Sequence, residues 1–316
     1  MRPIVLAVLG PTASGKTSLG LALAEKYRGE IINCDSTAVY RGFDIGTDKP
    51  PVEERRGIPH HLIDIADPTE VYTAAQFAQD AAAAIRDIHG RGKLPILVGG
   101  TGFYYRALTR GLFPGPGADE ALRARLDRVA DRRGPDTLHR MLKNVDPASA
   151  ARIMPRDRKR LVRALEVFFT TGRPLTSHFG DTASPIADCE VIAIVLKLPA
   201  ALTAERVARR VDRQFARGIV EEVKGLLARG VPPSARPFGG LVYRQVMEML
   251  RGVRDEHATR ALITQENRRY ARRQLIWFRK EPNLVWFDGP GERSETLQLV
   301  DDMLAARSRL PPGDAT

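Results

Sequence analysis

The sequence contains only two cysteines, Cys34 and Cys189, and no apolar run long enough to cross a membrane. The cysteines form no metal-ligand spacing and are too few for a disulfide framework, so neither kind of site is expected. A membrane helix needs about 20 apolar residues. The apolar run at residues 4–9 is also too short for a signal peptide. We therefore expect a cytoplasmic protein with no membrane partner.

Acidic residues are fewer than basic ones, at 38 against 49, and the formal net charge is +11. A charge of this size favours a polyanionic partner such as a nucleic acid. A generally basic proteome is the alternative explanation. The 316 residues, of which 43% are hydrophobic, can bury a large core in one or two domains.

The apolar run at residues 4–9 leads directly into the pattern G-x-x-x-x-G-K-T, which a helical pattern follows. A strand, this loop and a helix form the context of a phosphate-binding loop. Its backbone N–H groups converge on phosphate oxygens at the helix N-terminus, where the helix dipole also favours negative charge. The lysine adds a cation, and the threonine hydroxyl is a ligand for Mg²⁺. The predicted diphosphate- or nucleotide-binding residues, ATP included, are Gly10, Pro11, Thr12, Ala13, Ser14, Gly15, Lys16 and Thr17.

Two further predicted strands end in residues that can face this loop. Residues 31–34 are followed by Asp35, and residues 95–98 are followed by the glycine-rich turn 99–102. Ligands of open α/β sheets bind at the carboxyl ends of the strands, so Asp35 should face the phosphate site. An ATPase usually carries an aspartate after a strand such as 95–98. Its absence argues against a motor or a switch, and the glycines are expected to allow close approach of a bulky substrate.

Alternating strand and helix patterns predict an α/β fold, with a P-loop parallel sheet core, crossover helices and a helical insertion domain. The core is assigned to residues 1–112 and 190–316. It includes a helix at 74–89, a strand at 191–196, and helices at about 203–229 and 258–280. The insertion is assigned to residues 113–189, where arginine-rich helical patterns at 119–133 and 147–171 occur without any strand pattern.

Basic residues gather in two segments, 156–163 and 268–280. In the second segment, Arg269, Arg273 and Trp277 fall on one helical stripe at four-residue spacing. Arginines interleaved with aromatic residues suit phosphate contacts and base stacking on RNA. For the aromatic residues alone, packing in the core is the better interpretation. The pair at residues 60–61, His-His, fits no zinc spacing, and a local structural role is expected.

Together these blocks resemble the bacterial tRNA dimethylallyltransferases, also called tRNA isopentenyltransferases. The resemblance runs from the loop at Gly10 to the RRQLIWFR segment that ends at Arg279. Two segments depart from the family pattern. The family's Ile-Gly-Tyr is Leu241-Val242-Tyr243 here, and its Thr-Arg-Gln-Tyr is Asn267-Arg268-Arg269-Tyr270. The matching blocks between the two ends are Asp35-Ser36 with Tyr40 and Gly42, Asp44-Ile45-Gly46-Thr47 with Lys49-Pro50, Gly99-Gly100-Thr101-Gly102 with Tyr105, Arg163-Ala164-Leu165-Glu166-Val167, and Gly218 with Glu222-Val223.

The resemblance implies transfer of a dimethylallyl group from dimethylallyl diphosphate to N6 of the adenosine on the 3′ side of the tRNA anticodon. It assigns catalysis to Asp35 as general base, with Thr101 and Arg210 stabilising the diphosphate. Mg²⁺ is the implied cofactor, with Thr17 as its ligand. Because the loop then holds a leaving group rather than a triphosphate to be hydrolysed, the missing acid after residues 95–98 is expected. The protein is expected to act as a monomer.

The resemblance also implies a set of tRNA contacts that spans the core and the insertion. These positions are Asp35, Ser36, Thr37, Ala38, Thr101, Arg123, Lys159, Arg160, Leu161, Val162, Arg163, Gly239, Gly240, Leu241, Val242, Tyr243, Arg244, Arg272, Arg273, Gln274, Leu275, Ile276, Trp277, Phe278 and Arg279.

Three other functions share part of this pattern. A nucleoside monophosphate kinase has the same loop and could use the insertion as a lid, but it needs no basic surface on the C-terminal helix. Transfer of the same group to free AMP is a second alternative, which the two basic segments speak against. An RNA-binding protein with a nucleotide-dependent switch is the third, and it would leave Asp35 without a function.

Overall fold

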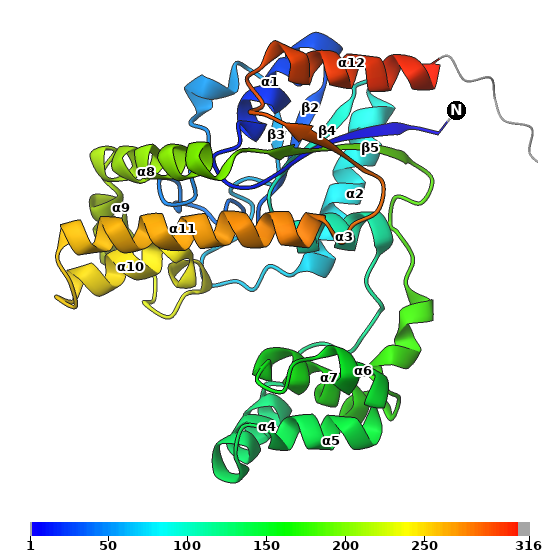
Figure 1. Cartoon of the computed structure of the whole chain (residues 1–316), viewed down its shortest axis with the longest axis vertical. Coiled ribbons are helices and arrows are strands. Elements are labelled where there is room, and N and C mark those ends of the chain that lie inside the picture. Colours follow the sequence, from blue (N-terminus) through cyan, green and yellow to red (C-terminus); the bar gives the residue numbers. More distant parts are fainter. Residues whose placement is uncertain (1, 309–316) are drawn as a thin grey trace, which may run out of the picture. The chain divides into compact units, whose positions relative to one another are not determined.

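The computed structural model describes residues 2–308 and contains a six-stranded parallel sheet. From edge to edge the strand order is β3-β2-β4-β1-β5-β6, so β1 lies inside the sheet (Figure 1). The predicted α/β fold with a parallel sheet is therefore confirmed. The strands are β1 (Ile4–Leu9), β2 (Glu30–Cys34), β3 (His60–His61), β4 (Pro95–Gly99), β5 (Glu190–Lys197) and β6 (Leu284–Asp288).

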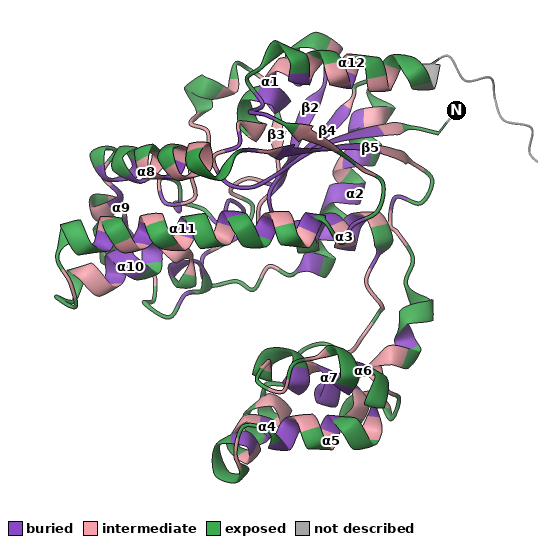
Figure 2. Ribbon diagram, viewed as in Figure 1, coloured by how far each residue is buried: buried purple, intermediate pink, exposed green. Residues whose placement is uncertain are grey.

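Helices cover both faces of the sheet, which explains why its central strands are almost wholly apolar. On one face, α1 and α12 pack in a cluster that includes Leu19 of α1 and Val300 of α12. On the other face, α2 lies against β2 and β4. Figure 2 shows the buried residues concentrated in the sheet and on the inner sides of these helices. Their bounds are α1 (Lys16–Tyr27), α2 (Ala74–Gly90), α3 (Gly102–Arg110) and α12 (Ser294–Ser308).

The register of the sheet brings three strand ends together. Leu9 of β1 and Cys34 of β2 both pair with Gly99 of β4, so the three strands end in one row. The residues that follow are Gly10 and Asp35, next to the turn after β4. Sequence segments that are far apart thus meet at one edge of the sheet.

A second hydrophobic cluster holds the loop that follows β2. Phe43 of this loop packs against Phe238 and Tyr243, with ring centroids 5.0 and 4.8 Å apart. Most of the other residues in the cluster come from four helices. The loop that begins at Asp35 is therefore anchored in the core rather than free. The four helices are α8 (Ala200–Ala216), α9 (Ile219–Ala228), α10 (Leu241–Leu250) and α11 (Glu256–Phe278).

The chain divides into two compact units, residues 1–109 with 185–316, and residues 110–184. The second unit begins and ends a few residues before the bounds of 113 and 189 that the sequence suggested. It is helical and has a core of its own, which includes Leu126, Leu142 and Leu165. Its helices are α4 (Glu120–Arg133), α5 (Thr137–Val145), α6 (Pro147–Arg152) and α7 (Arg158–Thr171), with a 3-10 helix at Leu175–Asp181.

Several predicted helices are shorter than the sequence suggested. The segment 147–171 is interrupted at 153–157, where Pro155 cannot donate a backbone hydrogen bond. The segment 203–229 is two helices, separated at Gly218, which has a φ of 89°. The helices α5, α10 and α12 and the half-buried edge strand β6 were not predicted. Among the described residues, no helix is both long enough and apolar enough to cross a membrane.

A buried carboxylate lies at the centre of the helical unit. Glu166 is fully buried and accepts hydrogen bonds from Arg123 Nε at 2.8 Å and from Arg163 Nη1 at 2.6 Å. The backbone N–H of Asp119 donates a further bond at 2.7 Å. Burial alone would raise the pKa of Glu166, but these hydrogen bonds and the charge of the Arg123 guanidinium lower it below its ordinary value. The carboxylate is therefore ionised and ties α4 to α7.

We expect Arg123→Met to destabilise the helical unit by about 3–5 kcal/mol, because it leaves the buried Glu166 charge poorly compensated. The pKa of Glu166 is lowered by folding, so its contribution to stability is present above the unfolded pKa of about 4.3. It is lost as the pH falls through the folded value. Hydrogen exchange of the α4 and α7 amides, followed from pH 7 to well below the unfolded pKa of about 4.3, measures both effects. The exposed Arg160→Gln is the control, and equal exchange in the two variants would contradict this assignment.

Candidate active site

A cavity of about 1120 Å³ opens at the edge of the sheet where β1, β2 and β4 end. It is lined by the phosphate loop, by the loop after β2 and by side chains of α8, α10 and α11. Asp35 and Arg210 both line it. The predicted phosphate loop and the predicted base therefore face one space within the larger unit.

The phosphate loop has the backbone of an anion site. Gly15 has a φ of 86°, a left-handed conformation that favours glycine. It is the N-cap of α1 and makes no side-chain capping hydrogen bond, and the first turn of α1 contains no acidic residue. The N-terminal amides of α1 are thus left for a ligand, and the dipole of the helix favours an anion there.

Two polar atoms around this loop have no protein partner. Ser14 Oγ is fully buried, and neither it nor Arg210 Nε forms a hydrogen bond with another described residue. The Arg210 guanidinium is held in place through Nη1, which donates to Thr12 Oγ1 at 2.6 Å and pairs with Asp48 at 3.4 Å. A buried polar atom without a partner is costly unless a ligand completes it. Both atoms fit a bound phosphate group.

Lys16 is held inside the loop, where its Nζ donates to the carbonyl of Pro11 at 2.6 Å. Burial and, as the second cause, the nearby positive charge of Arg210 lower the pKa of Lys16 to about 8. An anion bound beside the lysine would reverse this effect, because opposite charges favour the protonated form.

Asp35 is oriented by its own loop. Its Oδ1 accepts hydrogen bonds from the backbone N–H and the hydroxyl of Thr37, at 2.9 and 2.7 Å. Asn33 Nδ2 donates to the Asp35 carbonyl at 3.2 Å and to the Leu62 carbonyl at 2.9 Å. Oδ2 of Asp35 has no hydrogen bond to another described residue. One carboxylate oxygen is thus fixed and the other is available to a substrate.

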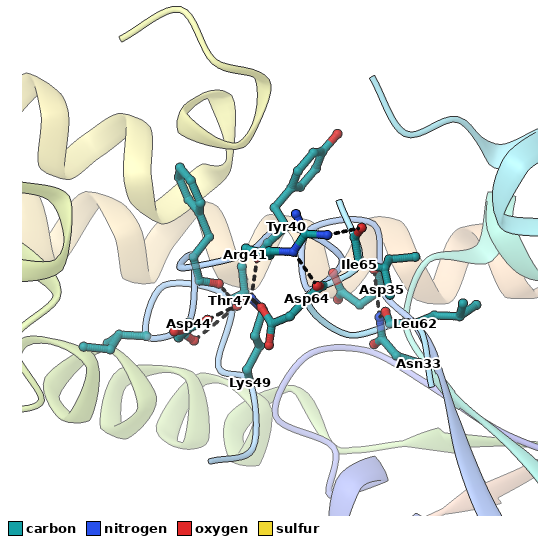
Figure 3. Close-up of polar contacts among 12 residues, drawn as sticks. Asn33, Asp35, Tyr40, Arg41, Asp44, Thr47, Lys49, Leu62, Asp64 and Ile65 are labelled. Atoms are coloured by element: carbon teal, nitrogen blue, oxygen red, sulfur yellow. Dashed lines mark hydrogen bonds and ion pairs between the residues drawn. The ribbon is translucent and has the colours of Figure 1, made fainter. Parts of the chain in front are cut away.

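Lys49 fixes the far part of the same loop (Figure 3). Its buried ammonium group donates to the Tyr40 carbonyl and to Asp64 Oδ1, both at 2.5 Å, and to Asp44 Oδ1 at 2.8 Å. Arg41 bonds the carbonyls of Asp64 and Ile65, both at 3.0 Å. These bonds join the segment after β2 to the segment after β3, so the wall of the cavity that carries Asp35 is rigid.

Glu222 and Gln214 support this loop from the helical layer. Glu222 Oε2 accepts from the N–H groups of Asp44 and Ile45, at 3.1 and 2.8 Å, and its Oε1 accepts from the Tyr243 hydroxyl at 2.6 Å. Gln214 donates to the carbonyls of Ile45 and Gly46, at 3.2 and 3.3 Å. The family block at residues 44–47 is therefore a turn held by side chains of α8, α9 and α10.

Gln274 of α11 ties the phosphate loop to the turn after β4. Its Oε1 accepts from Thr12 N at 3.0 Å, and its Nε2 donates to the Gly100 carbonyl at 2.8 Å. In the same turn, Thr101 Oγ1 accepts from the backbone N–H of Ser36 at 3.1 Å, which joins this turn to the Asp35 loop. The three segments of the site are thus linked directly to one another.

The glycines at the end of β4 and in the turn that follows are required by the packing of the protein itself, and Gly99 and Gly100 also line the cavity. A Cβ on Gly99 would lie 2.1 Å from the Cys34 carbonyl oxygen, and one on Gly100 would lie 2.3 Å from Gln274 Nε2. A Cβ on Gly102 would lie 2.4 Å from the ring of Trp277. The close approach is made by the protein itself, because the strand ends and α11 need this space.

The residues predicted to contact tRNA differ widely in exposure. In α11, Gln274 and Phe278 are buried, and the Trp277 ring lies 4.2 Å below the Arg106 guanidinium. Val242, at the position of the family glycine, is buried in the first turn of α10, as is its neighbour Tyr243. Side chains that are exposed in these segments of the larger unit are those of Arg244, Arg272, Arg273, Ile276 and Arg279.

In the helical unit, the predicted segment 159–163 separates into two groups. Lys159 and Arg160 are exposed, whereas Leu161 and Val162 are buried in the core. Arg163, like Arg123, is bound to Glu166. In this segment, therefore, only the side chains of Lys159 and Arg160 take no part in the core of the helical unit.

Several residues of the site were not identified from the sequence. Arg206, Arg209 and Arg213 of α8 line the cavity together with Arg210, as does Arg217 at the C-cap of this helix. Their spacing of three or four residues in the sequence indicates that these arginines share one face of a helix. Glu292, in the turn between β6 and α12, also lines the cavity, and its position depends on the order of the strands. His61 has the structural role expected, since its Nε2 contacts the buried Glu30 at 2.7 Å. His60, in contrast, lines the cavity, and its buried Nε2 has no hydrogen-bond partner among the described residues.

The fold and the loop at its centre define a P-loop-type α/β protein. The model of the IPP transferase family matches residues 38–281. The chain belongs to this family. The resemblance seen in the sequence is therefore confirmed.

Individual relatives match over nearly their whole length. A tRNA dimethylallyltransferase of Geobacter metallireducens is 47% identical over 300 residues, covering 94% of this chain and 96% of the relative. One of Thermomicrobium roseum is 46% identical over 311 residues, covering 97% of this chain and 93% of the relative.

Two solved structures are similar to this chain. The tRNA isopentenylpyrophosphate transferase of Bacillus halodurans has a TM-score of 0.71 and 36% identity, covering 97% of each chain. A eukaryotic dimethylallyltransferase acting on tRNA has a TM-score of 0.80 and 25% identity, covering 99% of this chain and 81% of its own.

We predict that binding of inorganic pyrophosphate near pH 8 takes up more protons in the natural protein than in Lys16→Arg. The free lysine, with a pKa of about 8, is partly neutral at this pH, and the bound anion raises its pKa. Arginine stays charged throughout. Calorimetry in buffers of different ionisation enthalpy measures the proton uptake. Equal uptake by both proteins would exclude Lys16 as the group that titrates.

Proposed function

We propose that this protein transfers a dimethylallyl group from dimethylallyl diphosphate to N6 of the adenosine on the 3′ side of the tRNA anticodon. The observation that carries the proposal is the register of β1, β4 and β2, which brings Asp35 and the phosphate loop into one cavity. The names of the relatives support the same activity. The kinase and the free-AMP alternatives are not favoured, because these relatives are tRNA-modifying enzymes.

The phosphate loop holds the diphosphate, which gains negative charge as the C–O bond to the dimethylallyl group breaks. The N-terminal amides of α1, Lys16 and Arg210 are positive groups already held at this point, and preorganised groups of this kind stabilise a developing charge. Ser14 Oγ and Arg210 Nε can donate further hydrogen bonds to the diphosphate, because neither atom has a partner among the described residues.

Mg²⁺ fits the same site. Among the described residues there is no group of three His, Cys, Asp or Glu side chains that could hold a metal alone. Thr17 lines the cavity next to Lys16, so its hydroxyl would be the ligand from the protein, and the diphosphate oxygens would supply further ligands. When bound, Mg²⁺ neutralises charge on the diphosphate.

Asp35 acts as the general base. The N6 amine is a weak nucleophile because its lone pair is delocalised into the purine, so removal of its proton as the C–N bond forms assists the reaction. Oδ1 of Asp35 is held by Thr37, while Oδ2 is left to accept this proton. The adenosine reaches the carboxylate only after it has left its stack in the RNA.

The tRNA is held by exposed basic side chains on both units. On the larger unit these are Arg244, Arg272, Arg273 and Arg279, and on the helical unit Lys159 and Arg160. Phosphate contacts by such residues provide most of the affinity of proteins for nucleic acids. The protein is proposed to act as a cytoplasmic monomer.

The proposal is tested by incubating the protein with unmodified tRNA, dimethylallyl diphosphate and Mg²⁺. Mass spectrometry of the digested nucleosides should show adenosine that carries the dimethylallyl group at the position 3′ to the anticodon. ATP with AMP as acceptor is the parallel reaction. Phosphoryl transfer there, with no prenylated adenosine in tRNA, would favour the kinase instead.

Asp35→Asn should lower the single-turnover rate by about 10²–10⁴-fold, because loss of a general base has this effect. The amide keeps an oxygen for the Thr37 hydrogen bonds, so tRNA affinity should change by less than about threefold. The matched control is Glu53→Gln, which neutralises another carboxylate that lines the cavity. A fall of less than about threefold in the Asp35→Asn rate would contradict its role as base.

Replacing Lys159 and Arg160 together by Gln should weaken tRNA binding and flatten its salt dependence, by about one unit of slope per lost phosphate contact. The control is Arg132→Gln with Lys143→Gln, which removes the same charge from exposed positions on α4 and α5. Binding titrations at several salt concentrations measure the slopes. If the two double variants show the same slope, the segment that begins α7 has no special part in tRNA binding.

A further inference from the structure

The phosphate loop has two flanks, because β1 lies inside the sheet. On one side of β1 lie β4 and β2, which lead into Thr101 and Asp35. On the other side lie β5 and β6, and β6 leads into the turn 289–293. Asp35 and Thr101 belong to the first flank. The second flank supplies Arg210 through α8, which follows β5, but the turn after β6 has no function so far.

The turn after β6 is packed tightly against the phosphate loop. The backbone N–H of Gly291 donates to the Ser14 carbonyl at 3.0 Å. A Cβ on Gly291 would lie 2.3 Å from the Gly15 carbonyl oxygen. The backbones of the turn and of the loop are therefore in direct contact, and no group of a ligand can pass between them.

Glu292 places a carboxylate beside the first residues of α1. A Cβ on Gly15 would lie 2.6 Å from Glu292 Oε2 and 2.7 Å from Oε1, so the carboxylate occupies the space next to this glycine. Arg206 Nη1 holds it in place at 3.2 Å from both oxygens. The dipole of α1 also favours a negative charge at this position. Because α1 has no acidic residue in its own first turn, this charge comes from a distant part of the sequence.

We propose that Glu292 is a specificity-determining residue that closes the β6 flank of the phosphate loop to a third phosphate group. A diphosphate fits between the loop, Lys16 and Arg210, and its organic group extends along the flank of Asp35. An additional phosphate on the other flank meets the Glu292 carboxylate, whose like charge disfavours binding and which also takes up the Arg206 guanidinium that could otherwise bind this phosphate. The inference rests on the proposed function, since it takes the loop to hold a diphosphate, and it predicts that nucleoside triphosphates are poor ligands.

The test compares inorganic pyrophosphate, inorganic tripolyphosphate and ATP by calorimetry in the presence of Mg²⁺. Glu292→Gln should raise the affinity for tripolyphosphate and for ATP by about tenfold, because it removes the like charge. The affinity for pyrophosphate should rise by a smaller factor, so that the ratio of the tripolyphosphate affinity to the pyrophosphate affinity increases. Glu295→Gln is the matched control, since it removes an exposed carboxylate from the first turn of α12 and should leave all three affinities unchanged.

The Glu292 side chain is 45% exposed, so its replacement should be tolerated, and Glu292→Ala repeats the test without the amide. Unchanged affinities for ATP and tripolyphosphate in both variants would overturn the proposal. A gain for ATP alone would also overturn it, because the third phosphate would then not be the excluded group. Failure of the natural protein to bind pyrophosphate, or to prenylate tRNA, would instead count against the proposed function.

Discussion

The structure depends on the common end point of three parallel strands. Leu9, Cys34 and Gly99 lie in one row, so the phosphate loop, the Asp35 loop and the turn of Thr101 begin side by side. This closeness is possible only because Gly99 and Gly100 have no side chains, and the space is taken by the Cys34 carbonyl and by Gln274. Gln274 then bonds both the phosphate loop and the turn. The phosphate loop and Asp35 are thus positioned by backbone geometry first and by side chains second.

Buried charges make the rest of the site rigid. The Lys49 ammonium group holds the loop after β2 to the segment after β3, and Glu222 holds the same loop to the helical layer. A buried ionic group is strongly destabilising when one partner is removed, but it contributes little net stability when all partners are present. These residues are therefore better understood as fixing the position of the loop than as stabilising the fold. The Glu166 network in the helical unit follows the same logic.

The basic character of the chain has more than one cause. Arg123 and Arg163 neutralise Glu166, and Arg106 lies over Trp277, so these cations are part of the folded structure. Lys159, Arg160, Arg272 and Arg273 are exposed and can bind phosphates. The arginines of α8 line the cavity itself. Net charge alone indicates a polyanionic partner, but only the surroundings of each cation distinguish structural arginines from binding ones.

Local patterns in the sequence were enough to predict the phosphate loop, the parallel sheet, the helical insertion and the strand end that carries Asp35. Each of these depends on neighbouring residues, as in the glycines and the lysine of the loop or the apolar run of β1. The positions of Gln274 and Glu292 were decided by the tertiary structure. Both lie more than 200 residues from the loop that they contact, and nothing in their own segments indicates that contact. The burial of Val242 and Phe278 was likewise decided by packing, because exposure depends on which elements cover a helix and not on its sequence alone.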